Sequence, residues 1–281
     1  MNFTKMHGAG NDYVYVNCFV EEVTNPEKLA IDISDRHFGV GSDGLVLILP
    51  SKIADAKMRM FNADGSEGEM CGNAIRCVGK YLYDNAICKK EDISIETLAG
   101  TKLLKMTVEN GIATHALVDM GIANFIAQEI PVDVDSVECI DHEITVLGKT
   151  YQGTAVSMGN PHFVIVTQDV ANLDLLTIGT HFENHKIFPK RINTEFVEII
   201  DKTTVSMRVW ERGSGETLAC GTGACATVAG LVKKGILQFD TENTVKLLGG
   251  ELVIRITKDF RVFMTGKATK VFDGVYKSYD F

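Results

Sequence analysis

Two ten-residue stretches of this 281-residue chain, DGSEGEMCGN at residues 64–73 and GSGETLACGT at residues 213–222, lie 149 positions apart. In each stretch a glycine-bearing loop leads into a Cys-Gly pair. Of the seven cysteines, only Cys71 and Cys220 correspond under this offset. Self-similarity at one fixed offset indicates a duplicated structural unit. We therefore expect two copies of one fold, each with one of these cysteines at the same place.

The rest of the chain follows the same offset. Residues 59–62 (RMFN) align with 208–211 (RVWE), and residues 10–11 (GN) align with 159–160 (GN), without a gap. Apolar patterning predicts strands at 12–19, 44–49, 57–61, 163–167, 194–200 and 205–210, further strands through residues 119 and 264, and helices at 26–37, 73–83, 173–185 and 223–234. Strands outnumber helices and do not alternate regularly with them as in a parallel sheet. The sequence thus predicts an α+β fold of two pseudo-symmetric domains, with the crossover near Gly121.

Composition restricts the kinds of function. The net charge of −9 provides no overall basic field for nucleic acid. No uncharged apolar run reaches the roughly 18 residues that a membrane helix needs. The N-terminal residues, MNFTKMHG, are too polar for a secretory leader. We expect a cytoplasmic protein that binds neither nucleic acid nor a membrane, and whose cysteines are mostly free thiols.

The position of the paired cysteines suggests proton transfer. Cys71 and Cys220 each directly precede a predicted helix, where unpaired N–H groups and a partial positive charge draw down the pKa of a thiol and can hold a carboxylate. Two such sites, one from each half, would place a thiol on either side of a substrate carbon. One removes the α-proton and the other delivers a proton to the opposite face. This arrangement predicts inversion of a stereocentre without a cofactor.

Seven segments, in order along nearly the whole chain, resemble one known family, diaminopimelate epimerase. They are KMHGAGND (5–12), FNADGSE (61–67), CGN (71–73), GNPH (159–162), RINT (191–194), WERG (210–213) and ACGTG (219–223). The family is PLP-independent and converts L,L-diaminopimelate to the meso form on the route to lysine and peptidoglycan. The resemblance implies domains built from a mainly antiparallel, β-barrel-like sheet around a central helix, at residues 1–120 plus about 266–281 and at residues 121–265.

The resemblance also implies roles for individual residues, no cofactor or metal, and a homodimer. Cys71 and Cys220 would be the acid–base pair, and His162 and Glu211 would steady the reacting end. Arg212 can bind the distal carboxylate with a bidentate fork. The complete set of implied substrate contacts is Asn11, Asn62, Gly72, Asn73, Asn160, Asn193, Glu211, Arg212, Gly221 and Thr222.

One position departs from the family's pattern. Some members have a substrate-contacting glutamine where this chain has Gly44, so that contact is not expected here. Its partner in the repeat, Asn193, is present.

Several alternatives remain open. A metal or redox site at Cys71 and Cys77 has unsuitable spacing, and Gly8-Ala9-Gly10-Asn11 precedes a strand, unlike a dinucleotide-binding loop. A racemase of proline, hydroxyproline or histidine would retain both cysteines but not the asparagine and arginine contacts. A non-catalytic amino acid binding protein would have both cysteines merely packed.

Overall fold

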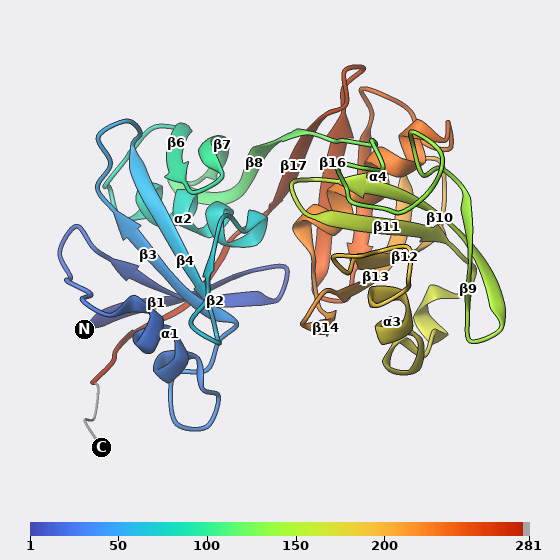
Figure 1. Ribbon diagram of the computed structural model, residues 1–281. Helices are drawn as coiled ribbons and strands as arrows, with labels where there is room; N and C mark the ends of the chain where they lie inside the picture. The colour runs from blue at the N-terminus through green and yellow to red at the C-terminus, as the bar shows by residue number, and fades with distance from the viewer. Residues whose placement is uncertain (278–281) are drawn as a thin grey trace. The chain divides into compact units, whose positions relative to one another are not determined.

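The computed structural model describes residues 1–277, and the chain forms two compact units (Figure 1). Among the described residues, the N-terminal unit comprises Met1–Val118 and residues 265–277, and the C-terminal unit comprises Asp119–Met264. Residues 278–281, which belong to the domain expected around Cys71, lie outside the described residues. The chain passes between the units within β8 (Ile112–Ile122) and again within β17 (Arg261–Lys267).

The N-terminal unit consists of a sheet and two helices. Besides β8, its elements are β1 (Asn2–Gly8), β2 (Asn11–Asn17), α1 (Pro26–Ser34), β3 (Gly44–Leu49), β4 (Ala56–Asn62), β5 (Glu67–Gly68), α2 (Gly72–Asp84), β6 (Asp92–Thr97), β7 (Gly100–Glu109) and β18 (Thr269–Val275).

The C-terminal unit repeats this sequence of elements. Besides β17, they are β9 (His142–Val146), β10 (Lys149–Ser157), β11 (Pro161–Val166), the 3₁₀ turn Val170–Asn172, α3 (Leu175–Glu183), β12 (Asn193–Ile199), β13 (Thr204–Glu211), β14 (Gly215–Thr217), α4 (Gly221–Lys233), β15 (Glu242–Leu247) and β16 (Gly250–Ile256).

The two units have equivalent topologies. Helices α1 and α3 begin and end 149 positions apart, and so do α2 and α4. The strand order β18-β1-β2-β3-β4-β6-β7 in one unit corresponds to β9-β10-β11-β12-β13-β15-β16 in the other. Most neighbours are antiparallel, while β2–β3, β4–β6, β11–β12 and β13–β15 are parallel. The duplication and the α+β fold predicted from the sequence are confirmed, and the sheet is mainly antiparallel, as expected, with these four parallel pairs.

Two helices are shorter than predicted, α1 and also α3, which spans Leu175–Glu183 rather than residues 173–185. Helix α1 ends at Ser34, whereas the apolar pattern extended it to residue 37. The carboxylate of Asp35 accepts hydrogen bonds from the backbone N–H groups of His37 and Phe38 at 2.7 Å. Such local side-chain bonds compete with helical bonds and end the helix.

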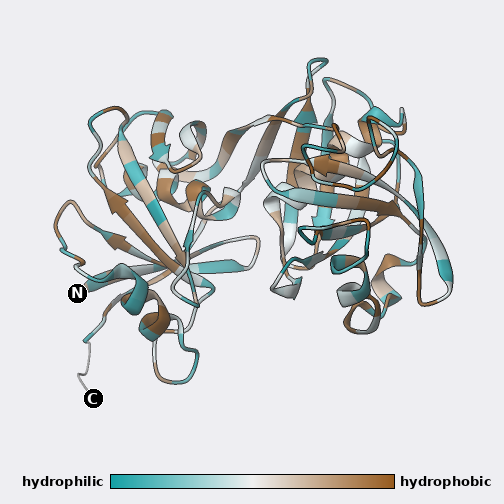
Figure 2. Cartoon of the chain, in the orientation of Figure 1, coloured by the Kyte–Doolittle hydropathy of each residue, from teal (hydrophilic) through white to brown (hydrophobic). Residues whose placement is uncertain are grey.

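The sheet of each unit is buried on both faces. In β2, Val14 and Val16 pack in one core cluster with Ile33 of α1. Tyr15 is also buried and donates its hydroxyl hydrogen to Ala74 of α2, so α1 and α2 cover opposite faces. This double burial explains why a strand such as β3, with the sequence GLVLIL, is apolar at nearly every position (Figure 2).

Helices α2 and α4 occupy the centres of their units. Ten of the thirteen residues of α2 are buried, and the helix packs against β1, β2, β6 and β7. Helix α4 packs in the same manner against β10, β11, β12 and β16. This arrangement confirms the predicted central helix of each domain. It also fixes the first turn of each helix, and with it the adjoining cysteine, in a packed environment.

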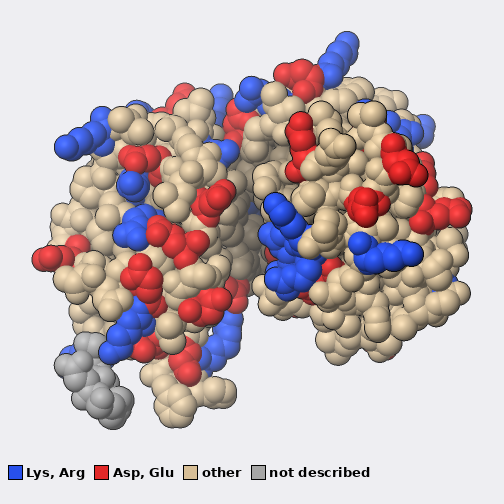
Figure 3. All heavy atoms as spheres, viewed as in Figure 1, with Lys and Arg blue, Asp and Glu red and all other residues tan. Residues whose placement is uncertain are grey.

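The surface carries both signs of charge. Figure 3 shows acidic and basic side chains interspersed over the visible face of each unit. Among residues 1–277, no helix has the length and apolar composition needed to span a bilayer.

Candidate active site

Cys71 is the residue immediately before the first turn of α2. Its backbone is extended, with φ −131° and ψ 121°, and the following Gly72 begins the helix. The carbonyl of Cys71 accepts the first helical bond, from Ile75 N at 2.9 Å. Its thiol is partly exposed and donates to Asn11 Oδ1 at 3.4 Å. The fold therefore places Cys71 where a ligand can meet both the thiol and the helix N-terminus.

Amide side chains surround the Cys71 thiol. Asn73 Nδ2 donates to Asn11 Oδ1 at 3.3 Å, and Asn11 Nδ2 donates to Asp43 Oδ2 at 2.8 Å. These bonds fix the orientation of the Asn11 amide. The phenol of Tyr13 is buried, and this burial, followed by the negative charge of a Cys71 thiolate, raises its pKa well above the usual value. Tyr13 thus stays a neutral hydroxyl beside the thiol.

A buried guanidinium supports this amide cluster from behind. Arg76 has no exposed surface. Its Nη2 donates to Asn73 Oδ1 at 2.8 Å, and its Nη1 donates to the carbonyl of Gly72 at 2.9 Å. A guanidinium can serve two acceptors with one rigid fork. Arg76 therefore holds the first turn of α2 and the side chain of Asn73 together.

Cys220 takes the equivalent position at the start of α4. Its thiol is almost fully buried, with 5% of the residue exposed. The sulfur accepts a hydrogen bond from Gly223 N at 3.4 Å and lies 3.5 Å from Thr222 Oγ1. Cys220 therefore caps its helix with its own side chain.

Carboxylates distinguish the surroundings of Cys220. Burial, and then the negative charges of Glu211 and Glu195, raise its pKa well above the usual value of a thiol. The sequence suggested that the helix N-terminus would draw this pKa down. For Cys220 that expectation is wrong in direction, because desolvation and two nearby carboxylates outweigh the helix terminus. Burial likewise raises the pKa of Glu211, which accepts a hydrogen bond from Thr217.

His162 lies within this carboxylate cluster and is fully buried. Its Nδ1 is 2.7 Å from Glu195 Oε1, and its Nε2 is 2.9 Å from Asn160 Oδ1. Asn160 Nδ2 in turn donates to Thr222 Oγ1 at 3.2 Å. The structure thus connects two predicted residues, His162 and Asn160, to the Cys220 helix terminus.

Arg212 and Asn193 form a second cluster in the C-terminal unit. Asn193 Oδ1 accepts a hydrogen bond from Arg212 N at 2.8 Å, and Asn193 Nδ2 donates to the carbonyl of Pro161 at 2.8 Å. The guanidinium of Arg212 is exposed and donates through Nη1 to Lys190 O at 3.0 Å. Its remaining N–H groups suit a carboxylate ligand.

Asn62 behaves differently from the other predicted asparagines. It is exposed, and its amide donates to Ser66 Oγ at 3.0 Å within the turn that follows β4. The structure therefore places Asn62 at the end of β4, bonded to the turn that follows it, rather than in the amide cluster of Cys71.

The remaining predicted residues are backbone positions or core thiols. Gly72 and Gly221 are buried at the first positions of α2 and α4. Cys77 and Cys225 are fully buried, as expected of core residues. Burial raises the pKa of Cys77 to about 11, which leaves it protonated and unreactive at neutral pH.

The sequence did not single out Tyr13 or Glu195. A signal existed for Tyr13, because the 149-residue offset aligns it with His162. Glu195 aligns with Val46 and has no counterpart in the other half. Its only sequence signal is a carboxylate inside the apolar pattern of β12, where all residues from Asn193 to Val197 are buried.

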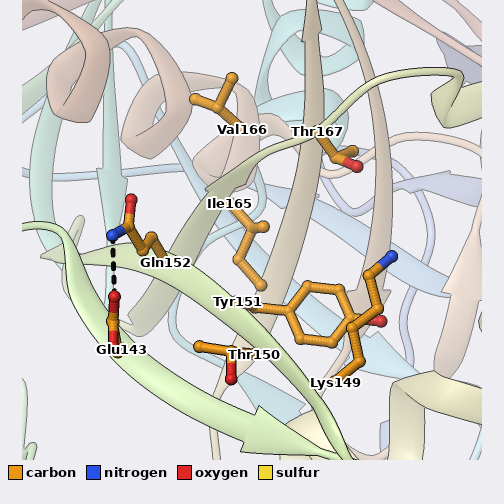
Figure 4. A pocket seen from close by; sticks show the side chains of 8 residues that line it. All are labelled: Glu143, Lys149, Thr150, Tyr151, Gln152, Ile165, Val166 and Thr167. Carbon is orange, nitrogen blue, oxygen red and sulfur yellow. Dashed lines mark hydrogen bonds between the residues drawn. The ribbon is translucent and has the colours of Figure 1, made fainter.

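A separate hollow lies on the surface of the C-terminal unit. It has a volume of about 360 Å³ and is lined by strands β9, β10 and β11, with Gln152 donating to Glu143 at 3.1 Å (Figure 4). None of the predicted site residues lines it. No group of three or more potential metal ligands occurs among the described residues.

The fold occurs in solved structures of racemases and epimerases. A probable proline racemase from Agrobacterium radiobacter matches with a TM-score of 0.74 and 15% identity, covering 100% of this chain and 94% of that one. A hydroxyproline epimerase from Agrobacterium vitis matches with a TM-score of 0.68 and 13% identity, covering 98% and 90%. A PhzF-family phenazine biosynthesis protein from Bacillus anthracis gives 0.71 and 18%, covering 98% of each chain. These TM-scores show that the chain shares its fold with these proteins.

Sequence comparison identifies the family. The sequence model of the diaminopimelate epimerase family matches residues 3–126 and 154–271. The diaminopimelate epimerase of Methanococcus maripaludis is 57% identical over 275 residues, covering 98% of this chain and 99% of the relative. That of Acetivibrio thermocellus is 56% identical, covering 98% of both. The chain belongs to the diaminopimelate epimerase family.

Proposed function

We propose that this protein interconverts L,L- and meso-diaminopimelate, with Cys71 and Cys220 as the two proton carriers. Family membership supports the substrate. The observation that carries the mechanism is the equivalence of the two thiols, each at the residue before a buried central helix in one of two duplicated units. A near-symmetric reaction suits a near-symmetric pair of acid–base groups.

The proton balance needs no redox partner. The thiolate of one cysteine removes the α-hydrogen as a proton, and the C–H electron pair remains on the substrate. The thiol of the other cysteine gives its proton to the opposite face of the same carbon. At the end the two cysteines have exchanged protonation states, and the reverse reaction restores them. N–H groups at the starts of α2 and α4 would stabilise the charge that develops on the carboxylate.

The neighbouring side chains fit supporting roles. Asn11 and Asn73 beside Cys71, and Asn160 and Thr222 beside Cys220, offer amide and hydroxyl groups to the substrate's ammonium and carboxylate. Arg212 binds the carboxylate at the non-reacting end, with Asn193 holding its backbone. These contacts would distinguish a substrate with two amino acid ends from proline or histidine.

Deuterium incorporation tests the chemistry. Enzyme incubated with L,L-diaminopimelate in heavy water, without added PLP or metal, should place deuterium at one α-carbon as the meso isomer forms. Cys71→Ser and Cys220→Ser should each lower the rate by about 10²–10⁴-fold, because each removes a proton carrier. Cys88→Ser, the same change at a thiol outside the site, is the matched control.

The same experiment separates the alternatives. Proline, hydroxyproline and histidine belong in the substrate panel, and faster inversion of one of them would identify a related racemase. Binding of diaminopimelate without exchange would indicate a non-catalytic binding protein.

The proposal also includes a homodimer and a cytoplasmic location. The family resemblance suggests the dimer, and light scattering on the purified protein would test it against the mass of a single chain. A cytoplasmic location suits the mechanism because the reducing cytosol keeps thiols free. Cell fractionation followed by the epimerase assay would check this location.

A further inference from the structure

Glu195 is a buried carboxylate that the proton-transfer scheme does not use. It lies on β12, has no exposed surface, and aligns with an apolar residue, Val46, in the other half of the repeat. Its Oε1 is 2.7 Å from His162 Nδ1. Its Oε2 is buried without a hydrogen-bond partner among the described residues. Burying a carboxylate costs free energy unless the carboxylate is paired. The position of Glu195 beside His162 therefore needs a physical explanation.

A chain of polar contacts leads from Glu195 to the Cys220 thiol. His162 Nε2 lies 2.9 Å from Asn160 Oδ1, and Asn160 Nδ2 donates to Thr222 Oγ1 at 3.2 Å. Thr222 Oγ1 lies 3.5 Å from the sulfur of Cys220. For Asn160 to present its oxygen to His162, the Nε2 atom must carry a hydrogen.

Charge balance favours this orientation of the Asn160 amide over the reversed orientation, in which the amide nitrogen faces His162. With a hydrogen on Nε2, His162 and Glu195 share one further proton between Nδ1 and Oε1, and the pair is neutral overall. If Asn160 were reversed, Nε2 would carry no hydrogen, Nδ1 would carry one, and Glu195 would be ionised. The buried pair would then have a net charge of −1, or Glu195 would have to carry a proton on Oε2, which has no acceptor among the described residues. An uncompensated buried charge of this kind is strongly disfavoured.

We propose that Glu195 is a positioning residue that keeps a hydrogen on His162 Nε2 and thereby orients the Asn160 amide toward Thr222 and Cys220. The effect of this positioning on turnover rests on the proposed epimerase function. In this arrangement His162 acts as a fixed hydrogen-bond donor rather than as a base for Cys220.

Other groups around the pair favour the same arrangement. The ionised form of Glu211 on β13 is stabilised by a positive charge on His162 and destabilised by a negative charge on Glu195. A neutral His162–Glu195 pair therefore limits the negative charge next to Cys220. Gly223 of α4 leaves space for the carboxylate, because a Cβ there would lie 2.7 Å from Glu195 Oε1 and 3.2 Å from the Cys220 sulfur.

The protonation of His162 can be measured directly. In protein labelled with ¹⁵N-histidine, the signal of His162 is identified among the seven histidines by its loss in His162→Gln. We expect Nε2 to carry a hydrogen at neutral pH, because Asn160 Oδ1 is its acceptor. A wild-type spectrum with an Nε2 that lacks hydrogen would overturn the proposal, whether or not the protein is an epimerase.

Matched variants test the link to turnover. Glu195→Leu removes the partner of Nδ1 at similar volume, and we expect mixed tautomers of His162 and a fall in kcat of about 10²-fold, as for a misplaced active-site group. Glu195→Gln can still donate from its amide to Nδ1, so it should retain the hydrogen on Nε2 and most of the activity. Glu198→Gln, the same change on the same strand away from His162, should leave both readouts unaltered.

Two outcomes in these variants would contradict the proposal. One is a folded Glu195→Leu protein that retains the Nε2 hydrogen and the wild-type kcat. The other is an equal loss of kcat in the Gln and Leu variants, which would mean that donation to Nδ1 is not what matters. If Glu195→Leu does not fold, the wild-type and Glu195→Gln spectra still decide the question.

Discussion

Gly179 of α3 lies directly against the indole ring of Trp210 in β13, so that a Cβ added at position 179 would lie 2.2 Å from the ring. The equivalent positions in the N-terminal unit are Ala30 and Phe61, which pack together in one core cluster. A smaller ring facing alanine in one unit thus corresponds to a larger ring facing glycine in the other. The two copies have kept the same packing volume with different residues.

This compensation predicts strong coupling between the two positions. Gly179→Ala should lower the free energy of unfolding by about 1–3 kcal/mol, because the added methyl group overpacks the core. Trp210→Phe should also destabilise, since it removes the hydrogen bond from the indole to Glu183. The double variant recreates the Ala–Phe pair and should be more stable than the sum of the single effects by about 1 kcal/mol or more. Denaturation followed by circular dichroism measures this, because Trp210 is the only tryptophan. Simple additivity would refute the coupling.

Gly44 should not tolerate the glutamine that some family members have there. A Cβ at this position would lie 2.0 Å from the backbone oxygen of Phe61 and 2.8 Å from the Tyr13 ring. Gly44→Ala and Gly44→Gln should each lower the free energy of unfolding by about 1–3 kcal/mol or more, since the backbone of β4 must move.

The control for Gly44 is Gly230→Ala in α4. Its added methyl would make ordinary contacts, at 3.5 Å or more, and alanine favours a helix. This variant should be neutral or up to about 1 kcal/mol more stable. Urea denaturation of all three variants makes the comparison, and a stable Gly44→Gln protein would show that β3 and β4 can separate locally.

The pKa of Cys220 should respond to Glu211. Because the carboxylate raises the pKa of the thiol, Glu211→Gln should lower that pKa and increase the thiolate fraction at a given alkaline pH. The ultraviolet absorbance of the thiolate, taken as the difference from the same protein with Cys220→Ser, follows this titration. Glu143→Gln, on the surface of the same unit, should leave it unaltered. An unchanged titration in Glu211→Gln would mean that burial and Glu195, without Glu211, set the pKa of Cys220.

Arg76 should support both stability and turnover. Arg76→Lys keeps the charge but cannot bond Gly72 O and Asn73 Oδ1 with one planar fork. We expect a loss of about 1–3 kcal/mol in the free energy of unfolding and a fall in kcat of about 10²-fold through the misplaced first turn of α2. Arg59→Lys, at a partly exposed ion pair with Glu67, should cost less, no more than about 1 kcal/mol, because solvent screens the pair. Wild-type turnover in Arg76→Lys would show that the planar fork of Arg76 is not needed to position the first turn of α2 for the reaction.

The sequence was sufficient to predict the duplicated architecture. The offset that aligns Cys71 with Cys220 also aligns α2 with α4 and α1 with α3 to the residue. This follows because helix patterns, turn glycines and core positions are local features that both copies retain. The end of α1 was misjudged, since the Asp35 side chain rather than apolar spacing ends that helix.

The chemistry around each cysteine was decided only by the tertiary structure. The sequence placed both thiols at helix starts, but it could not show that Glu195 and Glu211 meet at Cys220 while neutral amides surround Cys71. Charge, burial and hydrogen bonding act through space, and the pairing of β11, β12 and β13 determines which side chains share that space. The duplication is therefore a property of the sequence, whereas the difference between the two thiols is a property of the folded chain.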